Sequence, residues 1–403
     1  MPHTIIEKIF LAHGAESAAP GDTVWLDLDY RTARDFGGAS VVKHLLEHAP
    51  EQPVADPART LFTFDCNAPA NTAGYADNQH VCRLFARQHG IKVHDVDAGI
   101  GSHVLIESGL IRPGTTAVGT DSHYNILGAL GAFGQGMGDL DIAYAFARGR
   151  TWFEVPPSVR ITLTGMPAAN ASAKDVTLNL VGRLGAAGLL GRVGEVCGEW
   201  IDQADLASRI TLASMGTEIG AISLIVPGDD PAFQADADAD YESEIEIDID
   251  GLRPCASRPG HPEDVAPVHE IVAAGSVPID SVFIGSCTNG RIEDLRAAAA
   301  QLRGRRVEGG VMLRVVPATR QVWMQALEEG LIEVFMAAGG LVSNSGCGGC
   351  AAGQIGMTGA GEVQLSTSNR NFRGKQGAGE TYLVSPAVAA ASAVAGELTE
   401  PDR

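Results

Sequence analysis

Short apolar runs alternate with longer amphipathic stretches along most of the chain. Runs of about five apolar-rich residues between polar or glycine-containing segments predict strands, and apolar residues three and four apart predict helices. The expected helices are 79–89, 292–302 and 320–338, and the expected strands are 24–28, 59–64, 91–93, 116–119, 159–163, 245–249, 281–285, 311–316 and 341–342. Alternation of this kind is typical of a layered α/β fold.

The pattern divides into three units, and 403 residues are more than one hydrophobic core usually serves. A proline pair at 156–157 ends the first unit. An acidic stretch at 229–250, with one expected edge strand, and an irregular proline-rich piece at 253–267 precede the third. We therefore expect three α/β domains, at 1–155, 156–277 and 278–403.

The amino-acid composition limits the kinds of molecule that the chain is expected to bind. A formal net charge of −20 argues against nucleic acid or an anionic membrane surface. The chain has no apolar run of about 18 residues, and its first residues do not resemble a signal peptide. Seven cysteines, an odd number, do not suggest a disulfide framework. We expect a cytoplasmic protein in which an anionic substrate would need a locally positive site.

Three cysteines follow two of the expected strands. Cys287 comes after 281–285, and Cys347 and Cys350 come after 341–342. Ligand sites collect at the carboxyl ends of parallel strands, so these thiols are expected to meet. Iron–sulfur clusters take thiolate ligands, and three of them would leave one iron open. Zinc or a redox-active Cys-x-x-Cys pair remain alternatives, although zinc would need a second ligand pair that is absent.

Six segments resemble motifs of the aconitase superfamily, in the same order along the chain. The segments 285–289 and 345–350 are similar to its two cluster-binding signatures, and 367–375 is similar to its substrate-binding segment. The others are 119–123, 193–195 and 213–221. The resemblance covers nearly the whole chain. It implies three α/β/α domains with the cluster at the carboxyl ends of strands between them.

The resemblance also implies a function. A [4Fe–4S] cluster on Cys287, Cys347 and Cys350 would serve a hydro-lyase, whose open iron binds a hydroxyl and a carboxylate. The substrate would be a malate-like hydroxy di- or tricarboxylate, with isopropylmalate isomerisation the nearest activity. Only about thirty residues follow Arg370, so the serine base is expected on a separate small swivel-domain subunit. The alternatives are a diverged hydratase for another hydroxy acid and a non-catalytic cluster-bearing sensor or binding protein.

By the same resemblance, three residues belong to the acid–base network around the leaving hydroxyl: Asp121, His123 and Glu195. His123 could instead be a helix-capping or core histidine, and Glu195 a solvated helix carboxylate.

The substrate-binding segment supplies Asn369, Arg370 and Lys375. Arg370 is expected to hold a carboxylate through two parallel hydrogen bonds, unless it forms only a surface salt bridge. Relatives often have arginine where this chain has Lys375, which keeps the charge but lacks the planar fork.

Two departures from the family pattern concern histidines. Cys66, beside Asp65, stands where relatives have a histidine, and Ser102 stands at a second histidine position, with His103 following it. In an extended segment a shift of one residue turns the side chain to the opposite face. His103 can therefore substitute only if the local backbone differs. We expect Cys66 and Ser102 to face the cluster cavity, with Asp65, His103 or His123 taking over proton transfer, because only histidine titrates unperturbed near neutral pH.

Overall fold

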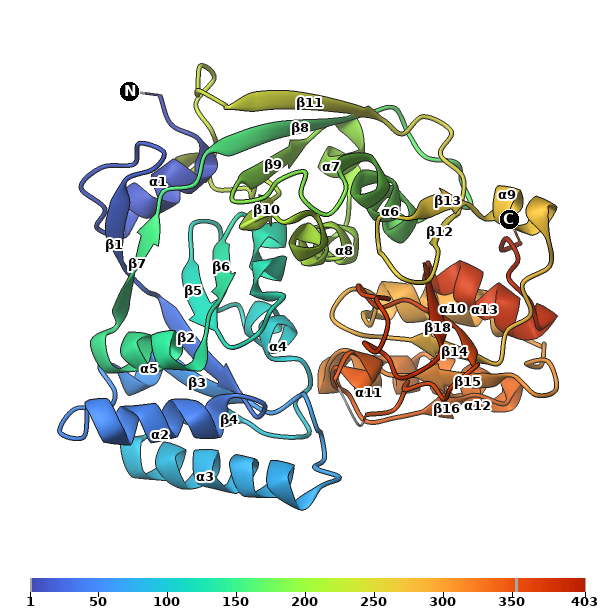
Figure 1. Ribbon diagram of the computed structural model, residues 1–403, viewed down its shortest axis with the longest axis horizontal. Helices are drawn as coiled ribbons and strands as arrows, with labels where there is room; N and C mark the ends of the chain where they lie inside the picture. The colour runs from blue at the N-terminus through green and yellow to red at the C-terminus, as the bar shows by residue number, and fades with distance from the viewer. Residues whose placement is uncertain (1, 352–353, 403) are drawn as a thin grey trace.

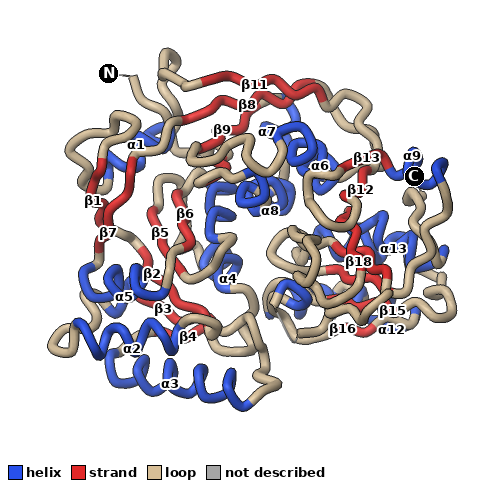
Figure 2. The backbone as a smooth tube through the Cα atoms, viewed as in Figure 1, coloured by secondary structure: helices blue, strands red, loops and turns tan. Residues whose placement is uncertain are grey.

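The computed structural model describes residues 2–351 and 354–402, and its strands form three main sheets (Figure 1). The first unit is drawn in blue to teal, the second in green to olive, and the third in orange to red. Figure 2 shows long loops on the side of the third unit that faces the first. Within the described residues, none of the helices combines the length and apolar character needed to cross a bilayer.

The first unit is built on a parallel sheet in the order β4-β3-β2-β5-β6. An antiparallel ribbon, β1 with β7, connects it to the second unit. Its strands are β1 Thr23–Asp27, β2 Tyr30–Arg34, β3 Thr60–Thr63, β4 Lys92–His94, β5 Thr116–Gly119, β6 Phe133–Gly136 and β7 Arg150–Glu154. Its helices are α1 Ile5–Ala12, α2 Gly38–His48, η1 Pro57–Arg59, α3 Ala73–His89, α4 Gly101–Glu107, η2 Tyr124–Leu130 and α5 Asp139–Arg148.

The second unit has a parallel sheet in the order β10-β9-β8-β11. The acidic strand β11 lies at the edge, as its alternation of charged and apolar residues predicts. The strands are β8 Ser158–Thr164, β9 Val193–Cys197, β10 Ser223–Ile225 and β11 Ser243–Asp248. The helices are α6 Ala173–Leu184, α7 Glu199–Gln203, α8 Leu206–Ser214, η3 Gly216–Ile219 and η4 Pro231–Phe233.

The third unit has a sheet in the order β13-β12-β18-β17-β14-β15-β16, parallel except for β12 and β13. Its strands are β12 Cys255–Ser257, β13 Val265–Pro267, β14 Ser281–Ile284, β15 Met312–Val315, β16 Leu341–Val342, β17 Val363–Ser366 and β18 Glu380–Val384. Its helices are α9 Val268–Ala274, α10 Ile292–Leu302, α11 Arg320–Glu328, α12 Leu331–Ala338, η5 Gly348–Cys350 and α13 Pro386–Ala395.

One hydrophobic cluster joins the three units. It packs Leu105 of the first unit, Ile210 of the second and Ala318 of the third, and it includes Cys287 and Cys347. Each sheet also has a cluster of its own. Burial of apolar surface between the units stabilises one arrangement of them, so this cluster helps to fix the positions of Cys287 and Cys347.

The structure differs from the expected elements in the third unit. The single helix expected at 320–338 is wrong: Gly330 adopts a left-handed φ of 73° and separates α11 from α12. The segment 253–267, expected to be irregular, contributes β12 and β13. The third sheet therefore begins before residue 278, the boundary that the sequence suggested.

Candidate functional site

Five strands end around one cavity of about 320 Å³. Arg34 is the last residue of β2, Asp65 and Asp121 follow β3 and β5, and Cys287 and Asn369 follow β14 and β17. The cavity is lined by Arg34, Phe36, Cys66, Tyr75, Thr120, Asp121, Ser122, His123, Cys287, Cys347, Cys350, Ala351 and Lys375. The expected site at carboxyl ends of strands between domains is confirmed, because β2, β3 and β5 belong to the first unit and β14 and β17 to the third.

Most of the site residues expected from the sequence meet here. Those that line the cavity are Cys66, Asp121, His123, Cys287, Cys347, Cys350 and Lys375. Three more, Asp65, Asn369 and Arg370, contact residues that line it. Ser102, His103 and Glu195 do not line it.

The three cluster-type cysteines present their thiols to the same space. The side-chain amide of Asn369 contacts two of them: its Nδ2 lies 3.4 Å from Cys287 Sγ, and its Oδ1 lies 3.6 Å from Cys350 Sγ. The third thiol, of Cys347, accepts a hydrogen bond from Arg34 Nη2. The donor set is therefore three sulfurs, which suits iron.

The glycines around these cysteines allow the close approach. Gly348 has a φ of 56°, and a Cβ there would lie 2.6 Å from the ring of Phe283. Only glycine fits this backbone position, so the turn that brings Cys347 and Cys350 together depends on it. The residues present fit an iron–sulfur cluster in both donor type and space.

Arg34 is a central residue that the sequence pattern did not indicate. Its guanidinium lies 2.7 Å from Asp65 Oδ1 and 2.9 Å from Asp121 Oδ1. Burial works against the charged guanidinium, but Asp121 and Asp65 outweigh it, so the pKa of Arg34 is raised. A permanent cation thus holds two carboxylates and one thiol at the cavity wall.

The loop that carries Asp65 and Cys66 is fixed by a buried carboxylate. Asp35 accepts the backbone N–H groups of Asp65, Cys66 and Asn67, at 3.2, 2.9 and 3.0 Å. Burial raises the pKa of Asp65 to about 6, although Arg34 opposes the shift. Asp65 is therefore a carboxyl group that changes protonation close to neutral pH beside the cavity.

His123, Glu218 and Arg370 form a second charged group. Glu218 Oε1 lies 3.0 Å from His123 Nε2 and 2.8 Å from Arg370 Nε, and the backbone N–H of His123 donates to Asp121. Burial alone would raise the pKa of Glu218, but His123 and Arg370 outweigh it and the pKa is lowered. The sequence reasoning missed Glu218, although it lies within the family-like segment 213–221.

A buried lysine supports the substrate-binding segment and was also missed. Lys174 is 0% exposed, and its Nζ donates to the backbone oxygens of Thr367 and Ser368, at 3.1 and 2.7 Å. These carbonyls directly precede Asn369 and Arg370. Lys174 thus fixes the course of the chain into the site. Its position on α6, remote in sequence, gave no signal of this contact.

The structure does not bring Glu195 to the site. Its carboxylate accepts the backbone N–H of Ile5, at the start of α1, and the hydroxyl of Tyr241, each at 2.7 Å. Glu195 is the third residue of the five in β9, not a residue beyond the carboxyl end of a strand. It anchors α1 to the second unit.

Ser102 and His103 do not line the cavity. Both are on α4, which begins at Gly101, so the extended backbone assumed for this segment is wrong. The hydroxyl of Ser102 is buried without a hydrogen-bond partner among the residues that the structure describes, and His103 Nε2 lies 2.9 Å from the backbone oxygen of Cys287. Ser102 thus does not face the cluster cavity, whereas Cys66 does. The imidazole of His103 holds the backbone of a candidate ligand.

The buried imidazole of His103 predicts a pH dependence of stability. Burial, with a contribution from Arg291, lowers its pKa from 6.5 to about 4. The unfolded chain therefore binds the extra proton below pH 6.5, and stability decreases as the pH falls from 6.5 towards 4. For a fully buried group this amounts to on the order of 3 kcal/mol.

In His103→Gln, the free energy of unfolding, measured between pH 7 and pH 4.5, should decrease less steeply as the pH falls. His94, whose pKa burial also lowers to about 4, remains in this variant and should leave part of the dependence. An unchanged slope would show that His103 already binds its proton in the folded chain.

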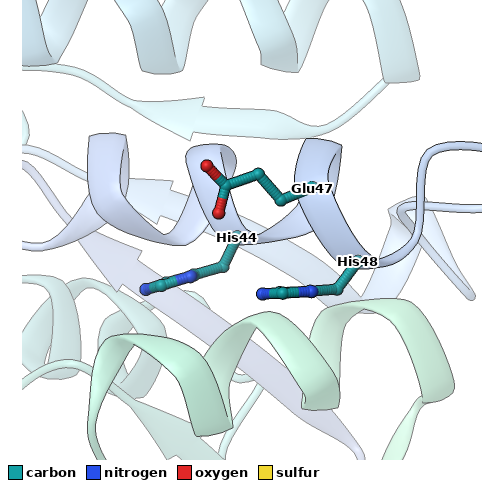
Figure 3. Close-up of side chains that lie close together, drawn as sticks. All are labelled: His44, Glu47 and His48. Atoms are coloured by element: carbon teal, nitrogen blue, oxygen red, sulfur yellow. The ribbon is translucent and has the colours of Figure 1, made fainter.

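A second group of ligand-type side chains lies away from this site (Figure 3). His44, Glu47 and His48 lie on α2, with ligand atoms within 4.8 Å of one another. The two imidazole rings are nearly parallel, with centroids 6.0 Å apart. They border a separate cavity of about 630 Å³ whose wall includes Trp25 and Trp152. None of the three lines the cysteine cavity.

Known proteins resemble the chain over its full length. The profile of the aconitase family (aconitate hydratase) matches residues 7–234 and 230–396. A probable 3-isopropylmalate dehydratase large subunit of Methanothermobacter thermautotrophicus is 41% identical, over 100% of this chain and 99% of the relative. A probable methanogen homoaconitase large subunit of the same organism is 38% identical, over 98% and 97%.

A solved structure supports the fold. The holo-form of Thermococcus kodakaraensis aconitase X superposes with a TM-score of 0.55 at 15% identity, over 91% of this chain and 89% of the other. The family profile and the relatives each cover almost the whole chain. The chain belongs to the aconitase family.

Proposed function

We propose that this hydro-lyase of the aconitase family acts on a malate-like hydroxy di- or tricarboxylate, in the manner of a 3-isopropylmalate dehydratase large subunit. One observation carries the proposal: four thiols, three of them from the cluster-type motifs, an acid–base network and two cationic side chains surround a single cavity. The names of full-length relatives at 38–41% identity support the substrate class.

Cys287, Cys347 and Cys350 would hold the [4Fe–4S] cluster. When bound, the cluster supplies a Lewis acid that makes a substrate hydroxyl a better leaving group. Asn369 orients two of the three thiols through its amide, and Arg34 places a positive charge at the third.

Arg370 and Lys375 would bind the carboxylates of the substrate. Glu218 fixes the Nε edge of Arg370, so the guanidinium is oriented before the substrate arrives. Lys375 lines the cavity directly and adds a second positive charge without directional preference.

His123 would transfer the proton to the leaving hydroxyl. Its Nε2 faces Glu218, and its Nδ1 lies 3.2 Å from the hydroxyl of Ser122, which also lines the cavity. Glu218 keeps the ring oriented through this contact. Asp121, whose pKa Arg34 and His123 lower despite burial, stays ionised and holds the backbone N–H of His123.

Proton abstraction would come from a serine of a small swivel-domain subunit, and this gives a direct test. The anaerobically reconstituted chain alone should show no turnover of 3-isopropylmalate, and adding the cognate small subunit should restore it. Formation of the unsaturated product, followed by its ultraviolet absorbance, measures both. Substantial turnover by the chain alone would show that the base lies within it.

Cys66 favours a second candidate, a hydratase for a different hydroxy acid. It lines the cavity where relatives have a histidine, so the pocket has a smaller side chain and one imidazole fewer. A panel of hydroxy di- and tricarboxylates, tested with the reconstituted pair, separates the two. Highest kcat/KM on a substrate other than 3-isopropylmalate would favour the second candidate.

A further inference from the structure

Cys66 places a fourth thiol beside one of the proposed cluster ligands. It is 5% exposed, Cys347 is 7% exposed, and both line the cavity. The interaction with Cys347 is the largest cause of the raised pKa of the Cys66 thiol. The other cysteines, Cys82, Cys197 and Cys255, do not line this cavity.

The backbone keeps the two cysteines together. The N–H of Cys347 donates to the backbone oxygen of Asp65, the residue before Cys66, at 3.0 Å. Gly346 packs on the same loop, since a Cβ there would lie 3.1 Å from that oxygen. Asp35 fixes the loop from its other side through three backbone N–H groups. A disulfide requires the backbones of its two cysteines to lie close together, and these contacts join the two segments that carry Cys66 and Cys347.

The remaining thiols of the cavity are less well placed to pair. The amide of Asn369 lies between Cys287 and Cys350 and contacts both sulfurs. The Arg34 guanidinium donates a hydrogen bond to the sulfur of Cys347.

We propose that Cys66 and Cys347 form a reversible disulfide when the metal-free chain meets a peroxide. The sulfur of Cys347 attacks one peroxide oxygen, the O–O bond breaks, and a sulfenic acid and water form. The thiol of Cys66 then displaces the hydroxyl from that sulfur, and a second water leaves as the S–S bond forms. Two thiols lose two protons and two electrons, and hydrogen peroxide becomes two waters.

The disulfide would control cofactor loading, and this consequence rests on the proposed function. Oxidised Cys347 cannot be a ligand, so only Cys287 and Cys350 remain for iron. The chain would stay unable to take up a cluster until a thiol reductant breaks the S–S bond. Relatives with a histidine in place of Cys66 lack this second thiol.

Peptide mapping tests the disulfide itself. The metal-free, reduced wild-type chain is treated with hydrogen peroxide, its free thiols are alkylated, and the digest is analysed by mass spectrometry without reduction. The main cross-linked peptide should join Cys66 to Cys347 and disappear after treatment with dithiothreitol. Because this uses the wild type, a variant that fails to fold cannot obscure the result. A main cross-link between Cys347 and Cys350, or none, overturns the proposal.

Iron uptake tests the consequence. After removal of the peroxide, the oxidised wild type should lose most of its uptake of Fe²⁺ when neither thiol nor sulfide is added, and dithiothreitol should restore it. Cys66→Ser should keep most of its uptake after peroxide, and Cys82→Ser, altered in the core of the first unit, should behave as wild type. If Cys66→Ser loses as much iron uptake after peroxide as the wild type does, the Cys66–Cys347 disulfide does not control cofactor loading. Failure of the fully reduced wild type to take up iron contradicts the proposed function instead, and leaves the peptide map unaffected.

Discussion

Replacing Cys287 with serine is expected to remove the iron–sulfur cluster and to abolish hydro-lyase turnover. Serine is a poor iron ligand, and the Asn369 amide that orients this sulfur loses its thiol partner. A metal Lewis acid contributes several kcal/mol to such reactions, so turnover with the small subunit should fall on the order of a thousandfold or more. Cys347→Ser and Cys350→Ser should behave alike. Iron and acid-labile sulfide per chain, with broad absorbance near 400 nm, report the cluster independently of activity.

Cys82→Ser provides the matched control for these variants. Cys82 is fully buried in the core of the first unit, away from the cavity, so its replacement should leave the iron content unchanged. Zinc in place of iron on Cys347 and Cys350, after anaerobic purification, would contradict the cluster proposal.

Arg370→Ala is expected to have the second large effect. It removes the proposed partner of a substrate carboxylate and leaves the buried charge of Glu218 with one cation fewer. Truncating one side of such a pair costs about 2–5 kcal/mol, or roughly thirty-fold to several-thousand-fold in kcat/KM. The measurement is steady-state kinetics of the reconstituted two-subunit enzyme.

Arg373→Ala is the control for Arg370, because Arg373 is an exposed arginine of the same segment. It should change kcat/KM little. Arg370→Lys should recover part of the loss, since it restores the charge but not the fork. Unchanged kcat/KM in Arg370→Ala would show that the segment does not bind the substrate.

Periodicity predicted those elements whose apolar residues are uninterrupted. The strand 116–119 and the helix 292–302 match β5 and α10 residue for residue. β2 went unnoticed because Arg31, 1% exposed, and Arg34 interrupt the apolar run of a buried strand. β12 and β13 have three residues each and lie in a proline-rich segment. β12 pairs with the distant β18, where Ala256 lies opposite Val384, and β13 pairs with β12, so tertiary pairing rather than local propensity forms them.

The meeting of the three cysteines was predictable, whereas the group around His123 was only partly so. Cys287 and Cys347 follow strands, and strand ends converge whatever the intervening sequence. Glu195 and Glu218 both lie in family-like segments, and only the tertiary fold shows that Glu218 reaches His123. The placement of Ser102 depended on whether its backbone is extended or helical, which the motif alone did not decide.

The central claim is that Cys287, Cys347 and Cys350 together bind iron in the cavity between the units. The most direct measurement is an anomalous difference map at the iron absorption edge, from crystals grown under strictly anaerobic conditions. Iron density is expected in the cavity, bonded to all three sulfurs and adjacent to Asp121 and His123. Absence of iron there, or a zinc signal confined to Cys347 and Cys350, would contradict it.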